Sequence, residues 1–199
     1  MQRAYTFAMS ANEVEIKFRV ADLGALAEKL RLAGFRLRTP RSHELNRLYD
    51  RPGHPLRRTG QLLRLRQYGS EWLLTHKNKG TSGRHKTREE TQTKVEDGEK
   101  VDAILRSLGY KPSFQYEKFR AEWTNGTGDV VVDETPIGNF AEIEGPPEWI
   151  DRTARTLGVA ENDYITQNYA ALFWDWKKRT RSKAKNMTYR EIGGATTRA

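Results

Sequence analysis

The 199-residue sequence predicts an α+β fold, in which a closed eight-stranded antiparallel β-barrel has helices packed outside it. Eight short runs read as strands, and the clearest of them alternate apolar and polar residues as half-buried strands do. Most of these runs are separated by short polar or glycine-containing connections, which favour antiparallel pairing. Eight antiparallel strands are enough to close a barrel.

The first predicted strand, residues 13–18, reads EVEIKF and is followed by a helix. Asp22 can cap the start of this helix, and Gly34 can end it. A similar unit recurs over residues 91–110, where a strand precedes a second helix with Asp97 as its cap and Gly109 as its stop. The two units suggest a weak internal repeat.

The remaining elements follow from the same signals. Further strands are predicted around residues 45–50, 61–68, 71–77, 85–95, 114–124, 129–135 and 139–145. The chain turns helical again over 146–158 and 163–176. Aromatic residues at helix-like spacing in the last segment, among them Tyr169 and Trp174, are expected to cover the barrel wall.

Composition limits the classes of protein. The formal charge is +9, but residues 177–199 carry +7 of it, so the rest of the chain is nearly neutral and its pI does not indicate a nucleic-acid groove. The absence of cysteine excludes disulfides, thiolate zinc sites and cysteine nucleophiles. With no apolar run long enough to span a bilayer and no secretory signal, a soluble cytoplasmic protein is expected. The predicted organisation is an N-terminal extension (1–12), a barrel domain (13–176) and a basic, disordered tail (177–199).

Charged residues recur on one face of nearly every predicted strand. Alternation groups Glu13 with Glu15 and Lys17, and it likewise groups Glu142 with Glu144. In an ordinary sandwich such stripes face water. In a closed barrel with helices outside, the apolar stripes would face the helices and the charged stripes would line the lumen.

A charged lumen of this composition suits one kind of ligand. Clustered carboxylates favour hard dications such as Mg²⁺ or Mn²⁺, and clustered ammonium and guanidinium groups favour phosphate oxygens. Together they indicate a metal–polyphosphate complex. The acidic set is Glu13, Glu15, Glu90, Asp133, Glu142 and Glu144, and the basic set is Lys17, Arg64, Arg66, Lys77, Lys118 and Arg120.

The sequence also resembles the CYTH superfamily, the triphosphate tunnel metalloenzymes. EVEIKF is similar to the Glu-x-Glu-x-Lys signature of that family. The resemblance continues in order through LYDRP, GQLLRLRQ, LLTHKNKG, KTREETQ, EKFRAEW, VVVDETPIGNFAEIEG and NYAALF. It implies a closed tunnel of eight antiparallel strands.

The resemblance assigns roles position by position. It implies that Glu13, Glu15 and Lys17 form the catalytic motif, with the two glutamates as metal ligands and the lysine as a phosphate contact. It further implies that the phosphate-binding set is Lys17, Arg64, Arg66, Lys77, Arg88, Lys118 and Arg120, and that Glu90, Asp133, Glu142 and Glu144 complete the acidic set. Gln92 stands where a second acid is common, which leaves the number of metal ions open.

Three functions remain open on this basis. A class IV adenylyl cyclase would convert ATP to cyclic AMP and pyrophosphate, and LGYKPSFQYEKFR resembles that branch. A triphosphatase would hydrolyse inorganic triphosphate, thiamine triphosphate or a nucleoside triphosphate. A non-catalytic module would bind polyphosphate or the 5′-triphosphate of RNA, with weak nucleic-acid contact through the tail KKRTRSKAK, although a solvated terminus also explains that segment. No membrane partner is expected, and the resemblance is compatible with a homodimer.

Overall fold

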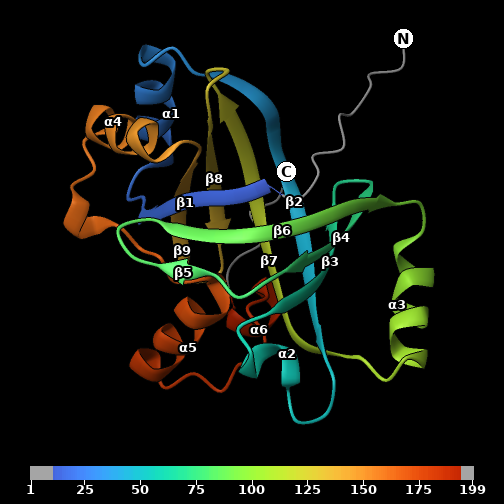
Figure 1. The fold of residues 1–199 in the computed structure, drawn as a ribbon. Helices are drawn as coiled ribbons and strands as arrows, with labels where there is room; N and C mark the ends of the chain where they lie inside the picture. Colours follow the sequence, from blue (N-terminus) through green and yellow to red (C-terminus); the bar gives the residue numbers. More distant parts are fainter. Residues whose placement is uncertain (1–10, 194–199) are drawn as a thin grey trace.

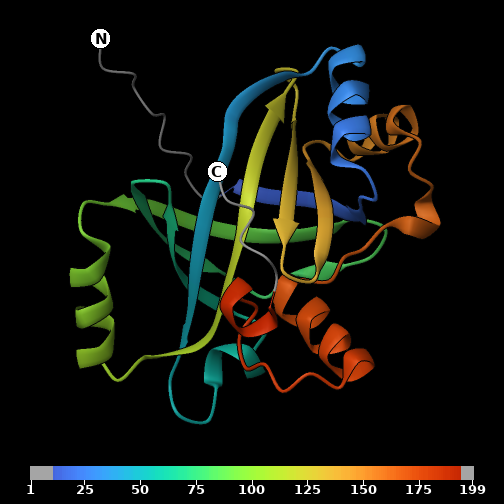
Figure 2. The same ribbon diagram turned by 180° about the vertical axis from the view of Figure 1, so that it is seen from behind.

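The computed structural model describes residues 11–193, whose strands form one antiparallel sheet that closes on itself (Figures 1 and 2). The strands are β1 (Ala11–Arg19), β2 (Arg36–Asp50), β3 (Leu62–Tyr68), β4 (Glu71–Lys77), β5 (Thr81–Ser82), β6 (Lys86–Val95), β7 (Lys111–Thr124), β8 (Asp129–Thr135) and β9 (Gly138–Glu144).

The pairing order confirms the predicted barrel. Neighbouring strands follow the order β1-β9-β8-β7-β2-β3-β4-β6, and β6 pairs back with β1 to close the ring of eight. Every one of these pairings is antiparallel. The two-residue strand β5 adds only to the outer edge of β6. Closure leaves an interior lined by one side of each strand.

The helices surround this barrel on three sides. They are α1 (Leu23–Leu32), α2 (Pro55–Arg58), α3 (Gly98–Ser107), α4 (Pro147–Leu157), the 3₁₀ helix η1 (Glu161–Asp163), α5 (Tyr169–Thr180) and α6 (Tyr189–Ile192). Figure 1 shows α1 and α4 side by side at one end, α3 on the opposite side, and α2, α5 and α6 together at the lower end. No helix within residues 11–193 is long and apolar enough to cross a membrane.

The predicted helix caps are present. Asp22 accepts a hydrogen bond from the backbone N–H of Ala25 at 2.9 Å, and Asp97 accepts one from Lys100 at 3.0 Å. The helix predicted over 163–176 begins later, at Tyr169, because Asn168 is its cap. Before that cap, Ile165 makes a backbone bridge with Lys17 on β1 instead of joining a helix.

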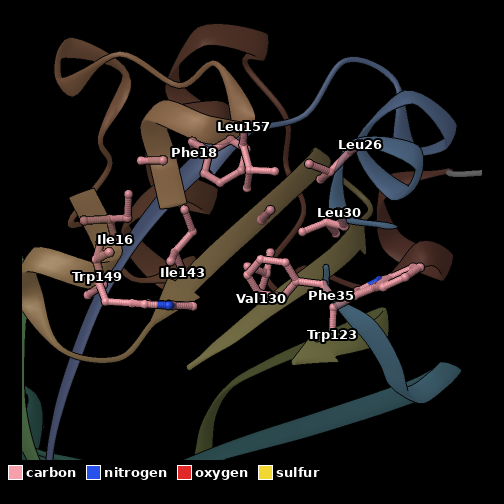
Figure 3. Packing of buried hydrophobic residues seen from close by; sticks show 13 residues of the cluster. Ile16, Phe18, Leu26, Leu30, Phe35, Trp123, Val130, Ile143, Trp149 and Leu157 are labelled. Atoms are coloured by element: carbon pink, nitrogen blue, oxygen red, sulfur yellow. The ribbon is translucent and has the colours of Figure 1, made fainter. Parts of the chain in front are cut away.

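The main hydrophobic core lies outside the barrel, between its wall and helices α1 and α4 (Figure 3). Ile16, Val130 and Ile143 are fully buried there, and each alternates along its strand with polar or charged residues. The wall approaches Trp149 of α4 so closely that a Cβ on Gly128 would lie 2.5 Å from its indole ring. The apolar stripes therefore face the helices, which leaves the charged stripes for the lumen.

The C-terminal part of the chain is folded against the barrel. β8 pairs with β7 only from Phe119 onward, so the part of β7 before Phe119 has an open edge on that side. Met187 pairs there in parallel, donating its N–H to Gln115 O at 3.0 Å and accepting from Glu117 N at 3.1 Å. Its side chain is fully buried in a second apolar cluster with Phe114 and Phe173.

The prediction of a disordered tail is therefore wrong for residues 177–193. Residues 194–199 lie outside the described part of the chain, and so do residues 1–10 of the predicted N-terminal extension. The first strand begins inside that extension, at Ala11.

Candidate functional site

The barrel encloses a cavity of about 630 Å³ whose lining is mostly charged. Each of the eight barrel strands contributes to the lining. The predicted site residues that line it are Glu13, Glu15, Lys17, Arg64, Arg66, Lys77, Arg88, Glu90, Lys118, Arg120, Glu142 and Glu144. The structure thus brings every predicted site residue except Asp133 to the surface of one cavity.

Ion pairs between neighbouring strands neutralise part of this charge. Lys17 Nζ lies 2.8 Å from Glu142 Oε1, and the two residues are direct partners in the β1–β9 register. Lys77 Nζ lies 2.5 Å from Glu13 and 2.6 Å from Glu90. Burial alone would lower the pKa of both lysines. The neighbouring carboxylates outweigh burial and raise the pKa of both, so both lysines stay protonated.

Asp133 lies beneath the cavity surface and is fully buried. Its carboxylate accepts hydrogen bonds from Lys118 Nζ at 2.8 Å, from Arg120 Nε at 2.7 Å and from the Tyr169 hydroxyl at 2.6 Å. With its oxygens engaged in this way, Asp133 holds the basic side chains in place. This position is at odds with the metal-ligand role that the sequence predicts for it.

Glu44 on β2 is a second buried carboxylate, and the sequence analysis missed it. It accepts from Asn46 Nδ2 at 2.8 Å and lies 3.4 Å from Arg66 NH1. Burial alone would raise its pKa, but the charges of Lys118, Arg120 and Arg66 lower it well below the usual range. Glu44 is therefore an ionised anchor for the basic cluster.

The basic cluster on β3 and β7 contains donors without a partner in the described part of the chain. Its members are Arg64, Arg66, Lys118 and Arg120. The Nε groups of Arg64 and Arg66 are buried and have no hydrogen-bond partner among the residues that the structure describes. The pKa of Arg66 is lowered by burial and by the charge of Arg64. The guanidinium and ammonium groups of this cluster line the cavity, and such groups are the donors that bind the oxygens of a polyanion.

Among the described carboxylates on β1, β8 and β9, Glu144 is the one that lacks a nearby cation. Glu144 is the register partner of Glu15 on one side and of Asp129 on the other, and all three line the cavity. No cation within residues 11–193 lies at ion-pair distance from Glu144. Burial, followed by the charges of Glu13, Glu15 and Glu142, raises the pKa of Glu144 to about 8.

This carboxylate row fits a hard dication in its chemistry. Carboxylate oxygens are the ligands that Mg²⁺ and Mn²⁺ prefer, and the crowding around Glu144 is what a bound dication would relieve. Within residues 11–193, no three acidic or histidine side chains are already close enough to hold an ion, and Lys77 and Lys86 pair with Glu13 and Glu15.

Gln92 belongs to the basic side of the cavity. Its side-chain oxygen accepts from Thr75 Oγ1 at 2.9 Å and from Arg66 NH2 at 3.0 Å. A carboxylate at this position would add a negative charge beside Arg66. The neutral amide instead leaves Arg66 available to an anionic ligand.

Tyr169, the first residue of α5, also lines the cavity, although the sequence analysis placed it on the outer wall. Lys17 Nζ and Lys118 Nζ each lie 4.6 Å from the centre of its ring. Its hydroxyl donates to Asp133. Tyr169 therefore holds two of the cavity's lysines through cation–π contacts with its ring, and it also shares the Asp133 carboxylate with Lys118.

Comparisons with known proteins agree with this fold. The CYTH domain model matches residues 11–169, and the chain belongs to that family. A protein of Methanocaldococcus jannaschii described as a candidate adenylate cyclase is 29% identical over 171 residues, which cover 80% of this chain and 97% of that protein.

Two solved structures show the same architecture. A candidate adenylate cyclase from Vibrio parahaemolyticus superimposes with a TM-score of 0.74 at 20% identity, covering 83% of this chain and 99% of the other. A Hippeastrum protein, described as a candidate adenylyl cyclase with a dominant triphosphatase activity, superimposes with a TM-score of 0.61 at 19% identity. The superposition covers 82% of this chain and 95% of the Hippeastrum chain. At sequence identities of 20% and 19%, these two similarities show a shared fold.

Proposed function

We propose that this protein is a metal-dependent enzyme that acts on a triphosphate substrate inside the barrel. The observation that carries the proposal is, within residues 11–193, the presence in one cavity of clustered arginines and lysines, two of whose buried Nε groups lack hydrogen-bond partners, and of a carboxylate, Glu144, that has no cation and a raised pKa. A triphosphate with a bound dication would correct both imbalances at once. An ordinary water-facing surface would not bury arginine Nε groups without a hydrogen-bond partner.

The basic residues would bind and orient the phosphates. Arg64, Arg66 and Lys118 offer donors from two strands. Glu44 holds Arg66 and Lys118, Asp133 also holds Lys118, and Thr75 accepts a hydrogen bond from Arg64. Lys17, Lys77, Arg88 and Arg120 complete the phosphate-binding set. Donors fixed before the substrate arrives stabilise charge that develops on a transferring phosphoryl group without further reorganisation.

The carboxylates would hold Mg²⁺ or Mn²⁺. Glu13, Glu15 and Glu144 are the proposed first choice, because Glu144 is crowded by the other two and has no cation of its own. Glu90 and Glu142 are further candidates, and each of them, like Glu13 and Glu15, is paired with a lysine that a dication would displace. A bound dication supplies neutralisation of phosphate charge and polarisation of phosphate oxygens.

The reaction itself has two candidate forms. Attack by the ribose 3′-hydroxyl on the α-phosphate of ATP would release pyrophosphate and form cyclic AMP, whereas attack by water would release orthophosphate or pyrophosphate. We favour the adenylyl cyclase form, in line with the name of the Methanocaldococcus relative. The activity printed for the Hippeastrum protein keeps the triphosphatase as the alternative. A non-catalytic module that binds polyphosphate or the 5′-triphosphate of RNA stays a third alternative, since residues 177–193 are folded on the barrel but expose basic side chains such as Arg181 and Lys183.

Product analysis tests this proposal. The protein is incubated with ATP or tripolyphosphate and with Mg²⁺ or Mn²⁺, and cyclic AMP, pyrophosphate and orthophosphate are resolved. Cyclic AMP with pyrophosphate from ATP identifies the cyclase, whereas orthophosphate or pyrophosphate released without cyclic AMP identifies the triphosphatase. Absence of every product, or turnover that chelation and Lys17→Met leave unchanged, would overturn the proposal.

A further inference from the structure

Lys86, the first residue of β6, is a cation of the lumen that belongs to neither the basic cluster nor the predicted phosphate-binding set. Its ammonium pairs with the Glu15 carboxylate on β1, and the two residues are direct partners where β1 and β6 lie side by side (Figure 1). The side chains of Lys86 and Glu15 are only 13% and 11% exposed. Because a pair so shielded from water is stronger than a surface pair, releasing either partner costs free energy.

Lys86 compensates only one of two neighbouring carboxylates. Glu15 lies between Lys86 and Glu144 in the register of β6, β1 and β9. Within residues 11–193, Lys86 makes no ion pair with Glu144. A dication carries two charges and takes several carboxylate oxygens, so it suits this pair of carboxylates better than one ammonium does. Lys86 is therefore the group that has to leave Glu15 when a dication binds there.

The backbone beside Lys86 is held in place, whereas its side chain is long and flexible. Arg84 NH2 lies 3.2 Å from Asp151 Oδ2 on α4, and His85 Nε2 lies 2.9 Å from Asp151 Oδ1. These contacts hold the start of β6 against α4. Once released from Glu15, the ammonium can therefore move mainly through rotation of its own stem. Because this side chain lines the lumen, the ammonium remains beside the groups that would bind phosphate.

We propose that Lys86 is a further phosphate-binding residue, which stays on Glu15 in the metal-free protein and becomes available to the substrate only when a dication replaces it there. This inference rests on the proposed function, because it places the metal and the triphosphate in the same lumen. Lys86 gives up a carboxylate oxygen and gains a phosphate oxygen, so its ammonium stays paired. Metal and triphosphate then strengthen each other's binding, and this coupling is reciprocal.

The test combines one change in the protein with one change in the metal. Calorimetric titrations measure the Kd of tripolyphosphate for the wild type and for Lys86→Met, first with Mg²⁺ and then in EDTA. With Mg²⁺, Lys86→Met is expected to weaken binding by about tenfold or more, since one charged hydrogen bond to phosphate is lost. In EDTA, Glu15 holds Lys86 away from the ligand in the wild type, so the two Kd values should agree within about threefold.

A second titration follows Mn²⁺ in the absence of phosphate. Lys86→Met should bind Mn²⁺ about tenfold more tightly than the wild type, because no ammonium competes for Glu15. Lys94→Met is the matched control, since Lys94 lies on the same strand and pairs with Glu71 but is exposed and outside the lumen. This control should leave every Kd unchanged. If Lys86→Met does not fold, Lys86→Gln removes the same charge and takes its place.

The outcomes separate this inference from the proposed function. A Kd of tripolyphosphate in Mg²⁺ that Lys86→Met leaves unchanged would overturn this inference alone. An equal loss in Mg²⁺ and in EDTA would do the same, because Lys86 would then contact phosphate without release from Glu15, and so would an unchanged Kd of Mn²⁺. Failure of the wild type to bind tripolyphosphate in Mg²⁺ would instead overturn the proposed function.

Discussion

Glu144 on β9 is the direct cross-strand partner of Glu15 on β1. On its other side, it is the partner of Asp129 on β8, which is paired with Arg38 at 2.8 Å. Like charges directly opposite each other destabilise a sheet. Glu15 and Asp129 have Lys86 and Arg38 as partners, so Glu144 is the member of this row whose charge raises the free energy of the folded protein until a proton or a dication neutralises it.

The stability of the metal-free protein is expected to fall as the pH rises from about 5 to 8. The pKa of Glu144 is about 8 in the folded protein, against an ordinary value of 4.5. In this interval the folded state holds a proton that the unfolded state has lost, so each rise in pH favours unfolding. Melting temperatures measured in EDTA across this range should decline, and Mg²⁺ should reverse the decline.

Glu144→Gln isolates this contribution from other titrating groups. The amide cannot ionise, so the variant should show a flatter pH profile and should be more stable than the wild type at pH 8.5. Parallel profiles for the two proteins would show that Glu144 is not crowded by its neighbours.

Glu15→Gln should abolish metal-dependent turnover without lowering the melting temperature of the metal-free protein. The substitution removes a proposed metal ligand, and it also relieves repulsion on Glu144. Turnover and thermal unfolding are measured on the same preparation. Glu71→Gln is the control, because Glu71 is also a strand glutamate paired with a lysine but lies outside the cavity. Wild-type turnover in Glu15→Gln would count against the assignment.

Glu44→Gln should destabilise the fold by about 3 kcal/mol, because removing one member of a buried ion network leaves Lys118, Arg120 and Arg66 with less compensation. Urea unfolding measures the loss. Glu28→Gln breaks an exposed pair with Arg31 and should change the free energy of unfolding by less than about 0.5 kcal/mol. Similar effects for the two variants would mean that Glu44 does not anchor the cluster.

Met187→Ala should also destabilise the protein, by about 3 kcal/mol, since the side chain is fully buried against the barrel. Lys183→Ala, at an exposed position of the same segment, should have little effect. The comparison is made by urea unfolding. A C-terminal segment that is independent of the barrel would give the same midpoint for Met187→Ala and the wild type.

The lumen could be predicted from the sequence because a strand has a period of two. Once the barrel was inferred, alternation alone placed Glu13, Glu15 and Lys17 inside and Ile16 outside. Glu44 was not predicted as a site residue, because the predicted strand began one residue after it. The first half of β2 is irregular, since it contains Pro40 and register shifts between Leu37 and Ser42.

Long-range contacts account for the other differences. The C-terminal segment is held in place by Met187, one methionine among many charged residues, which pairs with the open edge of β7. That edge is distant in the sequence, so no local pattern predicts the contact. Tyr169 belongs to an aromatic helix that packs on the outer wall. Only the position of α5 at the end of the barrel brings this one ring into the lumen.

The most direct test of the central claim is a calorimetric titration of the protein with tripolyphosphate in the presence of Mg²⁺. Binding of one ligand per chain is predicted, and Arg66→Met should weaken it by about tenfold or more, because a charged hydrogen bond to phosphate is lost. Absence of binding heat, or an affinity that Arg66→Met leaves unchanged, would contradict a triphosphate site in the barrel.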